Sequence, residues 1–462
     1  MSSDPSNSKL TFHHWKIWFL SAMGVFMDGF DLFIIAVALP LIMHMPDWNV
    51  TAVTAGLIGA ATPIGAIFGA VIFGRFTDKF GRKTILVLSV VFFVIFAGLS
   101  SIAWSPLSLI VFRFLLGVGI GADYPTGSTY VSETMPSHLR GRMLVGSFSF
   151  QAIGALTGAI LGLIILYLNP NIEAWRWMLG LGVLPAVIVL VLRMSLPESP
   201  RWLLEQGKKK EAKRIALKII GSKDILKKPK REPEGYRSLF KKKYRRRTAL
   251  TSISWFLMDV SLYGVGFFTP VILAKMSLAG DGSFIVQDIM ATRSAIYLDI
   301  FLVIGFVFAI FLVEKWGRNR LQKIGFIGMF IGLCMLATST HVAHGGFEMV
   351  LLFGGFIIFN LMVNCGPNPT TYLLPAELFP THIRATGHGF ASCTGKIGAA
   401  VGIFLLPICM QHFGLGPTMY AIAGTALLGF LITQWLGVET KGKTLEEIEN
   451  HQSNLNKFKG VA

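Results

Sequence analysis

Several ionisable side chains lie inside long apolar stretches of this sequence, and they are the residues best placed to do chemistry. An ionisable group in the hydrocarbon region of a membrane costs roughly 2.5 to 3.5 kcal/mol on insertion scales, so each needs a partner or a function. The set consists of Asp28, Asp31, Arg113, Asp123, Asp259 and Lys396, and Asp299 is expected near the outer end of its stretch. These residues predict a site for ions within a membrane.

Two of the carboxylates are close together in the sequence. Asp28 and Asp31 are three residues apart and therefore share one face of a helix. Two neighbouring carboxylates hold a proton more readily than one does, which suits a proton carrier. A structural ion pair with Arg113 is the alternative. Both interpretations can hold, because a proton that breaks such a pair acts as a switch.

Two polar stripes follow a four-residue period. Trp255, Asp259 and Tyr263 place an indole, a carboxyl and a phenol on one helix face, which favours a binding surface over simple packing of the aromatic rings. The second stripe is Asn360, Asn364 and Asn368, and the segment Gly366–Pro369 must interrupt the helix around it. Irregular backbone at membrane depth is tolerated where it lines a cavity. Polar packing between helices is the alternative for the first two asparagines, so Asn368 is the better site candidate.

Lys396 has apolar residues on both sides and lies too deep to extend to the membrane surface. Either an aspartate or an anionic substrate must neutralise it. Gln151 takes the corresponding place in the first half of the chain, at nearly the offset of the repeat described below. One positive charge, several neutral donors and nearby acids predict a pocket for a small oxyanion that arrives with protons.

The elements that position these residues are apolar runs of about 20 or more residues, the length that crosses a bilayer. With 53% hydrophobic residues and a mean hydropathy of +0.60, the chain is expected to be an all-α integral membrane protein. The runs lie near residues 15–43, 52–74, 84–104, 107–132, 144–168, 174–195, 248–274, 289–313, 321–342, 348–376, 387–411 and 417–438. This pattern divides the chain into a six-helix half at 1–200, a linker at 201–247, a second six-helix half at 248–440 and a tail at 441–462.

The net charge of +17 is concentrated in the linker, where 19 Lys and Arg accompany 5 Asp and Glu between Arg201 and Arg247. A basic segment between hydrophobic blocks orients a membrane protein with that segment in the cytoplasm, and it argues against nucleic acid as the partner. Lys and Arg also gather in alternate short connections, so the linker and both termini are expected in the cytoplasm. Within the linker, Lys208–Ile220 is predicted to be an amphipathic helix, and the four cysteines are predicted to be buried thiols.

The two halves of the chain share motifs. Glu133–Arg140 (ETMPSHLR) returns as Glu377–Arg384 (ELFPTHIR), and Gly74–Lys83 (GRFTDKFGRK) is echoed by Glu314–Arg318 (EKWGR). Related halves around a pseudo-two-fold axis imply a site at their interface near the midplane. The residues expected to form ion pairs or gates are Arg113, Asp78, Arg82, Glu133, Arg140, Glu377 and Arg384, with Asp78 as a latch on neighbouring helix ends.

These motifs, together with Pro197–Arg201 (PESPR) and Glu439–Glu447 (ETKGKTLEE), resemble the major facilitator superfamily, sugar-porter-like branch, over essentially the whole chain. The resemblance implies twelve transmembrane helices in two pseudo-symmetric halves. Segments such as Gly121–Pro125 (GADYP), Trp255–Tyr263 and Gly366–Thr370 (GPNPT) are similar to the phosphate:proton symporter family of fungi and plants. That resemblance implies that phosphate is held by Tyr124, Gln151, Trp255, Asp259, Tyr263, Asn368 and Lys396. It also implies a proton route through Asp28 or Asp31, Asp123 and Asp259.

Departures from that family leave other substrates open. The family usually reads GGDYP where this chain has Ala122, and its central loop is longer and more acidic. Asp28-Gly-Phe-Asp31 equally resembles aromatic-acid:proton symporters, so another organic anion or a sugar is an alternative to phosphate, and a nutrient sensor is a third hypothesis. Because the sequence has no nucleotide-binding loop, metal-ligand spacing or nucleophile–base set in a plausible context, we expect no enzyme and no cofactor. We expect a monomeric, ion-driven transporter in the bacterial inner membrane, with a small anion, a proton and the lipid bilayer as its partners.

Overall fold

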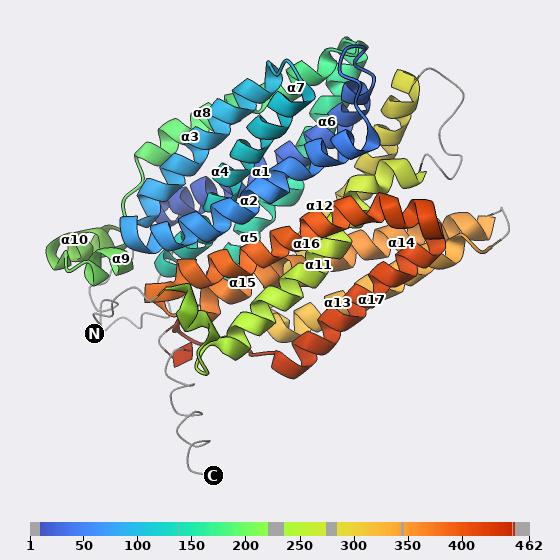
Figure 1. Cartoon of the computed structure of the whole chain (residues 1–462). Helices are drawn as coiled ribbons and strands as arrows, with labels where there is room; N and C mark the ends of the chain where they lie inside the picture. Colours follow the sequence, from blue (N-terminus) through green and yellow to red (C-terminus); the bar gives the residue numbers. More distant parts are fainter. Residues whose placement is uncertain are drawn as a thin grey trace.

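The computed structural model describes residues 10–136, 138–219, 235–273, 284–342, 346–445 and 447–448, and these residues form helices and short connections (Figure 1). Twelve helical segments are long and apolar enough to cross a membrane, which confirms the expected all-α fold with twelve spans. The helices are α1 (Phe12–Met43), α2 (Ala52–Phe80), α3 (Arg82–Ser101), α4 (Pro106–Thr134), α5 (Arg140–Phe148), α6 (Phe150–Leu168), α7 (Ala174–Leu181), α8 (Val183–Met194), α9 (Pro200–Glu205), α10 (Lys209–Ile219), η3 (Tyr236–Phe240), α11 (Arg245–Leu273), α12 (Phe284–Trp316), α13 (Arg318–Ser339), α14 (Gly346–Cys365), α15 (Pro367–Leu378), η5 (Thr381–Ile383), α16 (Arg384–Phe413) and α17 (Leu415–Leu436).

Three of the spans are interrupted helices. α5 and α6 meet at Ser149, α7 and α8 meet at Gly182, and α14 and α15 meet at Gly366. The last break was expected from the segment Gly366–Pro369, because proline lacks a backbone N–H and clashes with the preceding helical turn. Gly366 adopts φ −122° and ψ −89°, outside the helical region, and α15 then begins with Pro367. The break lies beside the asparagine stripe.

Helices α1 to α8 form one bundle and α11 to α17 form the other (Figure 1). Within the first bundle α2 packs closely on α4, because glycines on each helix face the other backbone. A Cβ on Gly117, for example, would lie 2.9 Å from the Thr62 Cα, and one on Gly69 would lie 3.0 Å from the Val118 Cα. Small residues let membrane helices approach in this way. In lipid the hydrophobic effect does not hold helices together, so van der Waals packing at close contact stabilises the pair.

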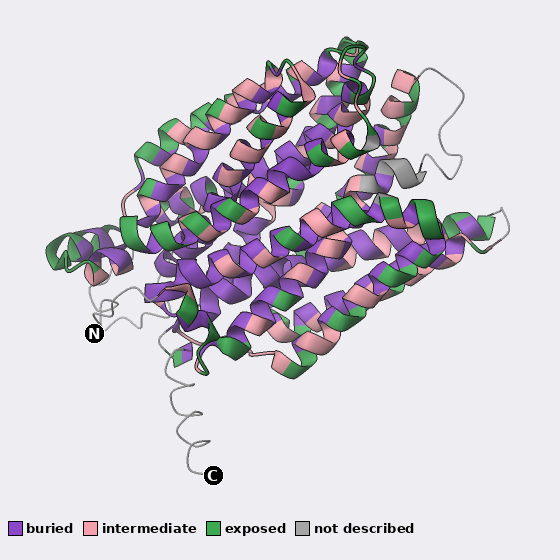
Figure 2. Ribbon diagram, viewed as in Figure 1, coloured by how far each residue is buried: buried purple, intermediate pink, exposed green. Residues whose placement is uncertain are grey.

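The two bundles meet along two helix pairs that the pseudo-symmetry relates, α2 with α16 and α12 with the α5–α6 span. Figure 2 shows buried residues concentrated between the bundles and exposed ones on the outer faces. Large apolar side chains on those outer faces, such as Phe68, Ile188, Phe311 and Leu428, are exposed. This distribution suits a protein whose perimeter is solvated by lipid.

The linker contains α9, α10 and η3. α10 matches the predicted amphipathic helix, with Ala212, Ile215, Ala216 and Ile219 buried on one face and lysines on the other. Residues 220–234 of the linker and 449–462 of the tail lie outside the described residues. The domain boundaries given above stay predictions.

For the rest of the description, the basic end of the bundles is the end with the Lys- and Arg-bearing connections that follow α2, α4, α12 and α15. The opposite end is called the outer end.

Candidate functional site

Lys396 lies at the centre of the molecule, on α16, and is 2% exposed. Its ammonium group is 3.3 Å from the Asp28 Oδ2 on α1, and it also donates to the Tyr263 hydroxyl at 3.0 Å and the Tyr124 hydroxyl at 3.4 Å. The same ammonium lies 4.6 Å from the centre of the Tyr124 ring and 5.0 Å from that of Tyr263. An aspartate therefore neutralises this lysine, one of the two possibilities that its sequence context left open.

Asp28 also accepts hydrogen bonds from residues other than Lys396. Its Oδ2 also receives a hydrogen bond from the Tyr124 hydroxyl and one of 3.1 Å from Gln151 Nε2. Gln151 comes from α6, at the start of that helix, and also donates to both tyrosine hydroxyls at 2.9 and 3.1 Å. The carboxylate thus lies where a cation, a phenol and an amide from different helices converge.

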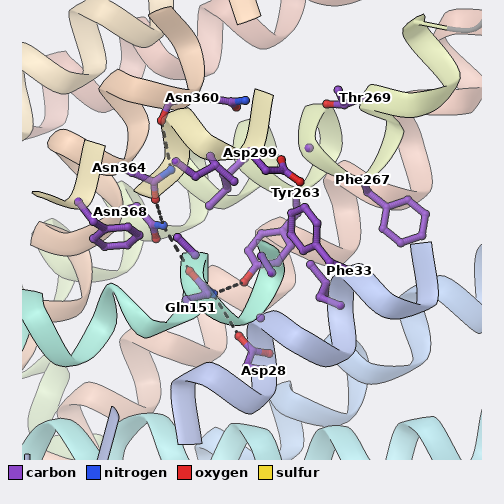
Figure 3. Close-up of a pocket in the computed structure, with 18 residues that line it drawn as sticks. Asp28, Phe33, Gln151, Tyr263, Phe267, Thr269, Asp299, Asn360, Asn364 and Asn368 are labelled. Carbon is purple, nitrogen blue, oxygen red and sulfur yellow. Dashed lines mark hydrogen bonds between the residues drawn. The ribbon is translucent and has the colours of Figure 1, made fainter. Parts of the chain in front are cut away.

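A chain of amides leads away from Gln151 along the asparagine stripe (Figure 3). Asn368 donates to Gln151 Oε1 at 3.4 Å and to the Asn364 Oδ1 at 2.7 Å. Asn364 in turn donates to the Asn360 carbonyl oxygen, and Asn360 donates to the Leu298 carbonyl oxygen of α12, both at 3.2 Å. The stripe therefore links α14, the break at Gly366 and α15 to the polar centre.

These residues border an open cavity of about 580 Å³ between the two bundles. Of the predicted substrate contacts, Gln151, Tyr263 and Asn368 line it, together with Asp28. Its other walls are mostly apolar, from α1, α11 and α12, and include Leu32, Phe33, Leu262, Phe267, Leu302 and Phe306. Tyr124 and Lys396 lie behind this lining and reach it through their bonds to Asp28 and Gln151.

Trp255 lies on the basic side of this site and is 2% exposed. Its ring is 5.5 Å from His388 and 6.4 Å from Tyr372, and the Tyr372 ring stacks on Phe148 at 4.2 Å and 11°. Phe148 belongs to one bundle and the other three rings to the second, so this aromatic layer closes the space between the cavity and the basic end. Trp255 also packs against Gly395, where a Cβ would lie 2.5 Å from the indole Cδ1, and it thereby supports the turn that carries Lys396.

Asp259 is buried on α11, one turn from both Trp255 and Tyr263, and is 2% exposed. It lies close enough to Lys396 and Asp28 to interact electrostatically with both. Among the described residues, its carboxylate forms no hydrogen bond or salt bridge. It is therefore an acid beside the polar centre whose charge is only partly compensated.

Asp31 and Asp123 have their own arginines. Arg113 holds Asp31 through two bonds of 3.0 and 3.2 Å, and Thr62 adds a third donor at 3.2 Å. Asp28 and Asp31 thus have different partners, although they share a helix. Arg193, near the end of α8, binds Asp123 through bonds of 2.5 and 3.0 Å. Sequence reasoning missed Arg193, although an arginine inside the sixth apolar run was the signal that could have found it.

At the basic end, the repeated motif forms two equivalent clusters. In the first, Glu133 accepts bonds of 2.9 and 3.1 Å from Arg82 and one of 2.6 Å from Ser199, all within its own bundle. It also accepts a bond of 3.3 Å from Arg384 of the other bundle. Glu198 accepts from the Arg82 backbone N–H at 2.8 Å and so holds the start of α3.

The second cluster repeats the first with the bundles exchanged. Glu377 accepts bonds of 3.1 and 3.2 Å from Arg318 and one of 2.6 Å from Thr440 of its own bundle and tail. Arg140 reaches it from the other bundle at 3.1 Å. Glu439 accepts from the Arg318 backbone N–H at 3.1 Å, as Glu198 does for Arg82. Arg318, Ser199 and Thr440 were not among the expected gate residues.

Asp78 connects the bundles directly. Its Oδ2 accepts from the Thr386 N–H at 2.9 Å and the Thr386 hydroxyl at 2.8 Å, at the first turn of α16, while its Oδ1 lies 3.4 Å from Arg82. Nearby, α2 and α16 touch through Gly74, where a Cβ would lie 2.9 Å from the Ala385 carbonyl oxygen. The negative charge at a helix N-terminus is favourable. These contacts hold the basic end closed.

Glu205, at the end of α9, lies beside the first cluster. Burial raises its pKa to about 7, an effect that the positive charge of Arg82 opposes and the negative charges of Glu133 and Asp78 reinforce. This group can therefore change its charge near neutral pH at the closed end of the molecule.

The outer end is open. A vestibule of about 1660 Å³ lies there between α1, α2, α12 and α16 and shares Phe33, Gly266, Phe267 and Asp299 with the central cavity. With the basic end closed and this vestibule sharing lining residues with the cavity, the two bundles are open at the outer end.

Comparison with known proteins supports the fold and assigns the family. The family model described as "Sugar (and other) transporter" matches residues 17–451. The inner membrane metabolite transport protein YgcS of Escherichia coli is 31% identical over 435 residues, which cover 94% of this chain and 93% of the relative. The probable inorganic phosphate transporter 1-6 of Arabidopsis thaliana is 30% identical over 495 residues, which cover 96% and 94% of the two chains.

The solved structure of the proton:xylose symporter XylE bound to 6-bromo-6-deoxy-D-glucose has a TM-score of 0.81 at 22% identity and covers 95% of this chain and 99% of that one. It has the same fold. With a family match over almost its whole length, this chain belongs to the sugar (and other) transporter family of the major facilitator superfamily.

Proposed function

We propose that this protein is a proton-coupled symporter that takes up a small oxyanion, with inorganic phosphate as the expected substrate. The proposal depends on one observation above all, the convergence of Lys396, Gln151 and Tyr124 on the carboxylate of Asp28. A cation, an amide and a phenol at hydrogen-bond distance of one point are the donors that an oxyanion needs. Asp28 occupies that point in the structure.

Competition between Asp28 and the substrate couples anion to proton. While Asp28 is ionised, it holds these donors and its charge repels an incoming anion. A proton taken up by Asp28 from the outer water weakens those bonds and frees Lys396 and Gln151 for an oxyanion. Tyr263 and Asn368 lie within the same network and would complete the anion's contacts. Binding of the proton therefore favours binding of the anion, and binding of either one alone is disfavoured.

Release follows from the arrangement of the bundles. The positive-inside rule places the basic end in the cytoplasm in this proposal. Opening of that end would break the bonds of Asp78 and separate the aromatic layer, which exposes the site to the cytoplasm. Loss of the proton to the cytoplasm restores the Asp28 charge, which expels the anion from Lys396.

The relatives support phosphate among the possible anions, because the Arabidopsis thaliana relative is named as a probable inorganic phosphate transporter. A second substrate class has its own support in the cavity. Walls such as Leu32, Leu302 and Phe306 offer more apolar surface than an inorganic ion can use. An organic anion with an apolar part, such as an aromatic acid, is therefore the second candidate.

Uptake into proteoliposomes tests the proposal and separates the two substrates. Purified protein is reconstituted, a pH gradient is imposed, and accumulation of radiolabelled phosphate is measured with arsenate, sulfate or benzoate as competitors. We expect accumulation that collapses when a protonophore dissipates the gradient and that arsenate inhibits. Inhibition by benzoate, together with gradient-driven uptake of labelled benzoate and no phosphate uptake, would favour the organic anion instead.

Lys396 supplies the matched variants for this assay. Lys396→Ala should lower affinity for the transported anion about 10- to 100-fold, since it removes a charge-assisted hydrogen bond and leaves the acids uncompensated. Lys396→Arg should retain only part of the wild-type affinity, because a planar guanidinium does not replace the point charge of an ammonium. Wild-type affinity in the alanine variant would remove Lys396 from the site.

A further inference from the structure

Asp299 lies on α12 where the central cavity joins the outer vestibule, and it lines both spaces. The side chain is 6% exposed, and Figure 3 shows it among the residues around the cavity. Its Oδ2 has no hydrogen-bond partner among the described residues. A carboxylate with an unsatisfied oxygen thus borders the path by which a substrate reaches the site.

Apart from Asp288 of the vestibule, whose Oδ2 also has no hydrogen-bond partner among the described residues, the acids between the bundles differ from Asp299 in their surroundings. Asp28, Asp31 and Asp123 form ion pairs with Lys396, Arg113 and Arg193, respectively. Asp259 interacts with Lys396 through space. Among the described residues, no Lys or Arg pairs with Asp299. An ionised carboxylate costs several kcal/mol in such a place, so either a proton or a bound cation must neutralise it.

The helices packed against α12 bring few titratable groups to this position. These helices are α1, α5, α6, α11, α13 and α14. The groups that they direct toward the centre of the molecule are Asp28 and Asp31 of α1 and Asp259 and Tyr263 of α11. Glu348 of α14 lies near the outer start of its helix, and Arg140 and Arg318, at the starts of α5 and α13, lie at the basic end. On α12 itself, Asp288 lines the vestibule farther out, and Arg293 is exposed.

Asp299 also has a polar connection to the substrate site. The adjacent residue Leu298 accepts the hydrogen bond of Asn360, the first amide of the chain that continues through Asn364 and Asn368 to Gln151. Asp299 and these amides line the same cavity. An anion that approaches from the vestibule passes the Asp299 carboxylate before it reaches Lys396.

We propose that Asp299 is a second proton-binding site of the transport cycle, loaded from the outer vestibule. This inference rests on the proposed symport of an anion with protons. In the outward-open state, Asp299 takes a proton from outer water, and the neutral acid lets an anion pass without repulsion. When the basic end opens and the vestibule closes, the proton leaves to the water of the cytoplasmic side, and the restored charge disfavours return of the anion.

Infrared spectroscopy tests the proton itself without any substrate. The carbonyl stretch of a protonated carboxylic acid is followed in difference spectra of the purified protein during a pH titration. Because Glu205 also holds a proton near neutral pH, we expect several such bands, one of which Asp299→Asn removes and Asp288→Asn, on the same helix but farther out, leaves in place. Asp299→Glu should keep the band at a shifted position. If the band persists in Asp299→Asn, or if sodium ions rather than protons remove it from the wild type, the proposal is wrong.

Transport measurements then test the role of that proton. Asp299→Asn should lower accumulation driven by a pH gradient at least about fivefold, while exchange of labelled for unlabelled substrate across the membrane continues. Asp288→Asn is the matched control and should keep wild-type accumulation. Normal gradient-driven accumulation in Asp299→Asn would overturn the proposal, even if the infrared band is lost. Absence of any anion transport in the wild type would instead refute the proposed function. The infrared result would still show whether Asp299 binds a proton, because that measurement needs no substrate.

Discussion

Asp259 is buried beside Lys396, so it and a substrate anion held by Lys396 would be like charges close together. Two unit charges about 4 Å apart repel by about 4 kcal/mol at an effective dielectric constant of 20. Lys396 can compensate only one of the negative charges around it, and Asp28 already takes that role in the empty site. A bound anion therefore requires a proton on at least one of the two acids.

The variant Asp259→Asn tests this requirement, because asparagine mimics the protonated acid. We expect it to bind phosphate with a weaker dependence on pH and to exchange internal for external phosphate, yet to fail to accumulate it against a gradient. Paired measurements of counterflow and of gradient-driven uptake in proteoliposomes check both parts. Thr269→Val, a change elsewhere on the cavity wall, serves as the control. Accumulation at the wild-type level in Asp259→Asn would show that Asp259 takes no part in coupling and would leave that role with Asp28 and Asp299.

Glu205 provides a pH dependence of stability. Its pKa is raised from 4.5 to about 7 in the folded protein. The folded state then binds this proton more tightly than the unfolded chain, so the free energy of unfolding falls as the pH rises from about 4.5 to about 7. Glu205→Gln should flatten that fall by about 1 to 3 kcal/mol. Thermal unfolding in detergent across this pH range measures the change in stability, and the exposed Glu211→Gln serves as the control. If the unfolding free energy of Glu205→Gln varied with pH as in the wild type, the assignment would be contradicted.

The sequence allowed the types of residue at the site to be predicted better than their partners. Lys396, Gln151 and Asn368 stood out because a polar group in an apolar run is costly wherever the run folds. Their partners depend on how helices rotate about their axes, and periodicity within one helix does not determine that. Asp28 and Asp31 share a helix, yet one faces Lys396 of the second half and the other faces Arg113 of the first.

At the scale of helices, the contact of α2 with α16 decides whether the basic end is closed. Gly74 allows the two backbones to touch, and Asp78 caps the first turn of α16 through Thr386. The motif predicted Asp78 as a latch on neighbouring helix ends, and the latch role stays a prediction. The identity of Thr386 did not follow from the motif, because only the packing of the two halves places it there.

Removal of the Asp78 charge should weaken this contact. Asp78→Asn loses a charge-assisted bond to the Thr386 backbone N–H, which is worth about 1.5 to 3 kcal/mol, so the population open at the basic end should rise about tenfold or more. We expect slower transport with binding still measurable. Labelling of single cysteines placed in the α2–α16 contact should increase, whereas Glu173→Gln, which removes an exposed pair with Arg176 at the outer end, should leave it unchanged. Equal labelling in Asp78→Asn and the wild type would count against the latch.

At the scale of the whole molecule, transport requires the two bundles to rock against each other. Twelve spans in two halves were predictable because apolar run length and the repeated motifs are local properties of the chain. Which end is closed was not predictable, since the same sequence must form both arrangements. The pairing of α2 with α16 and of α12 with the α5–α6 span gives the rocking motion its interface.

A covalent link across the closed end should stop that motion. In a background where Cys334, Cys365, Cys393 and Cys409 are replaced, Asp78→Cys and Thr386→Cys place two thiols where side chains already touch. We expect oxidation to abolish both uptake and exchange while substrate still binds from the outer side, and reduction to restore transport. Each single cysteine variant serves as its own control under the same oxidant. Transport at an unchanged rate after quantitative cross-linking would show that the basic end need not open.

The exchanged arginines of the two basic-end clusters have a consequence for the height of the barrier between the two arrangements. When the bundles separate, Glu133 loses Arg384 but keeps Arg82 and Ser199, and Glu377 loses Arg140 but keeps Arg318 and Thr440. No carboxylate is stripped of its counter-ion, and the two released guanidinium groups enter a cleft that water is filling. Glu133 and Glu377 therefore each keep a counter-ion from their own half while the basic end opens, which avoids the cost of leaving a charged acid unpaired.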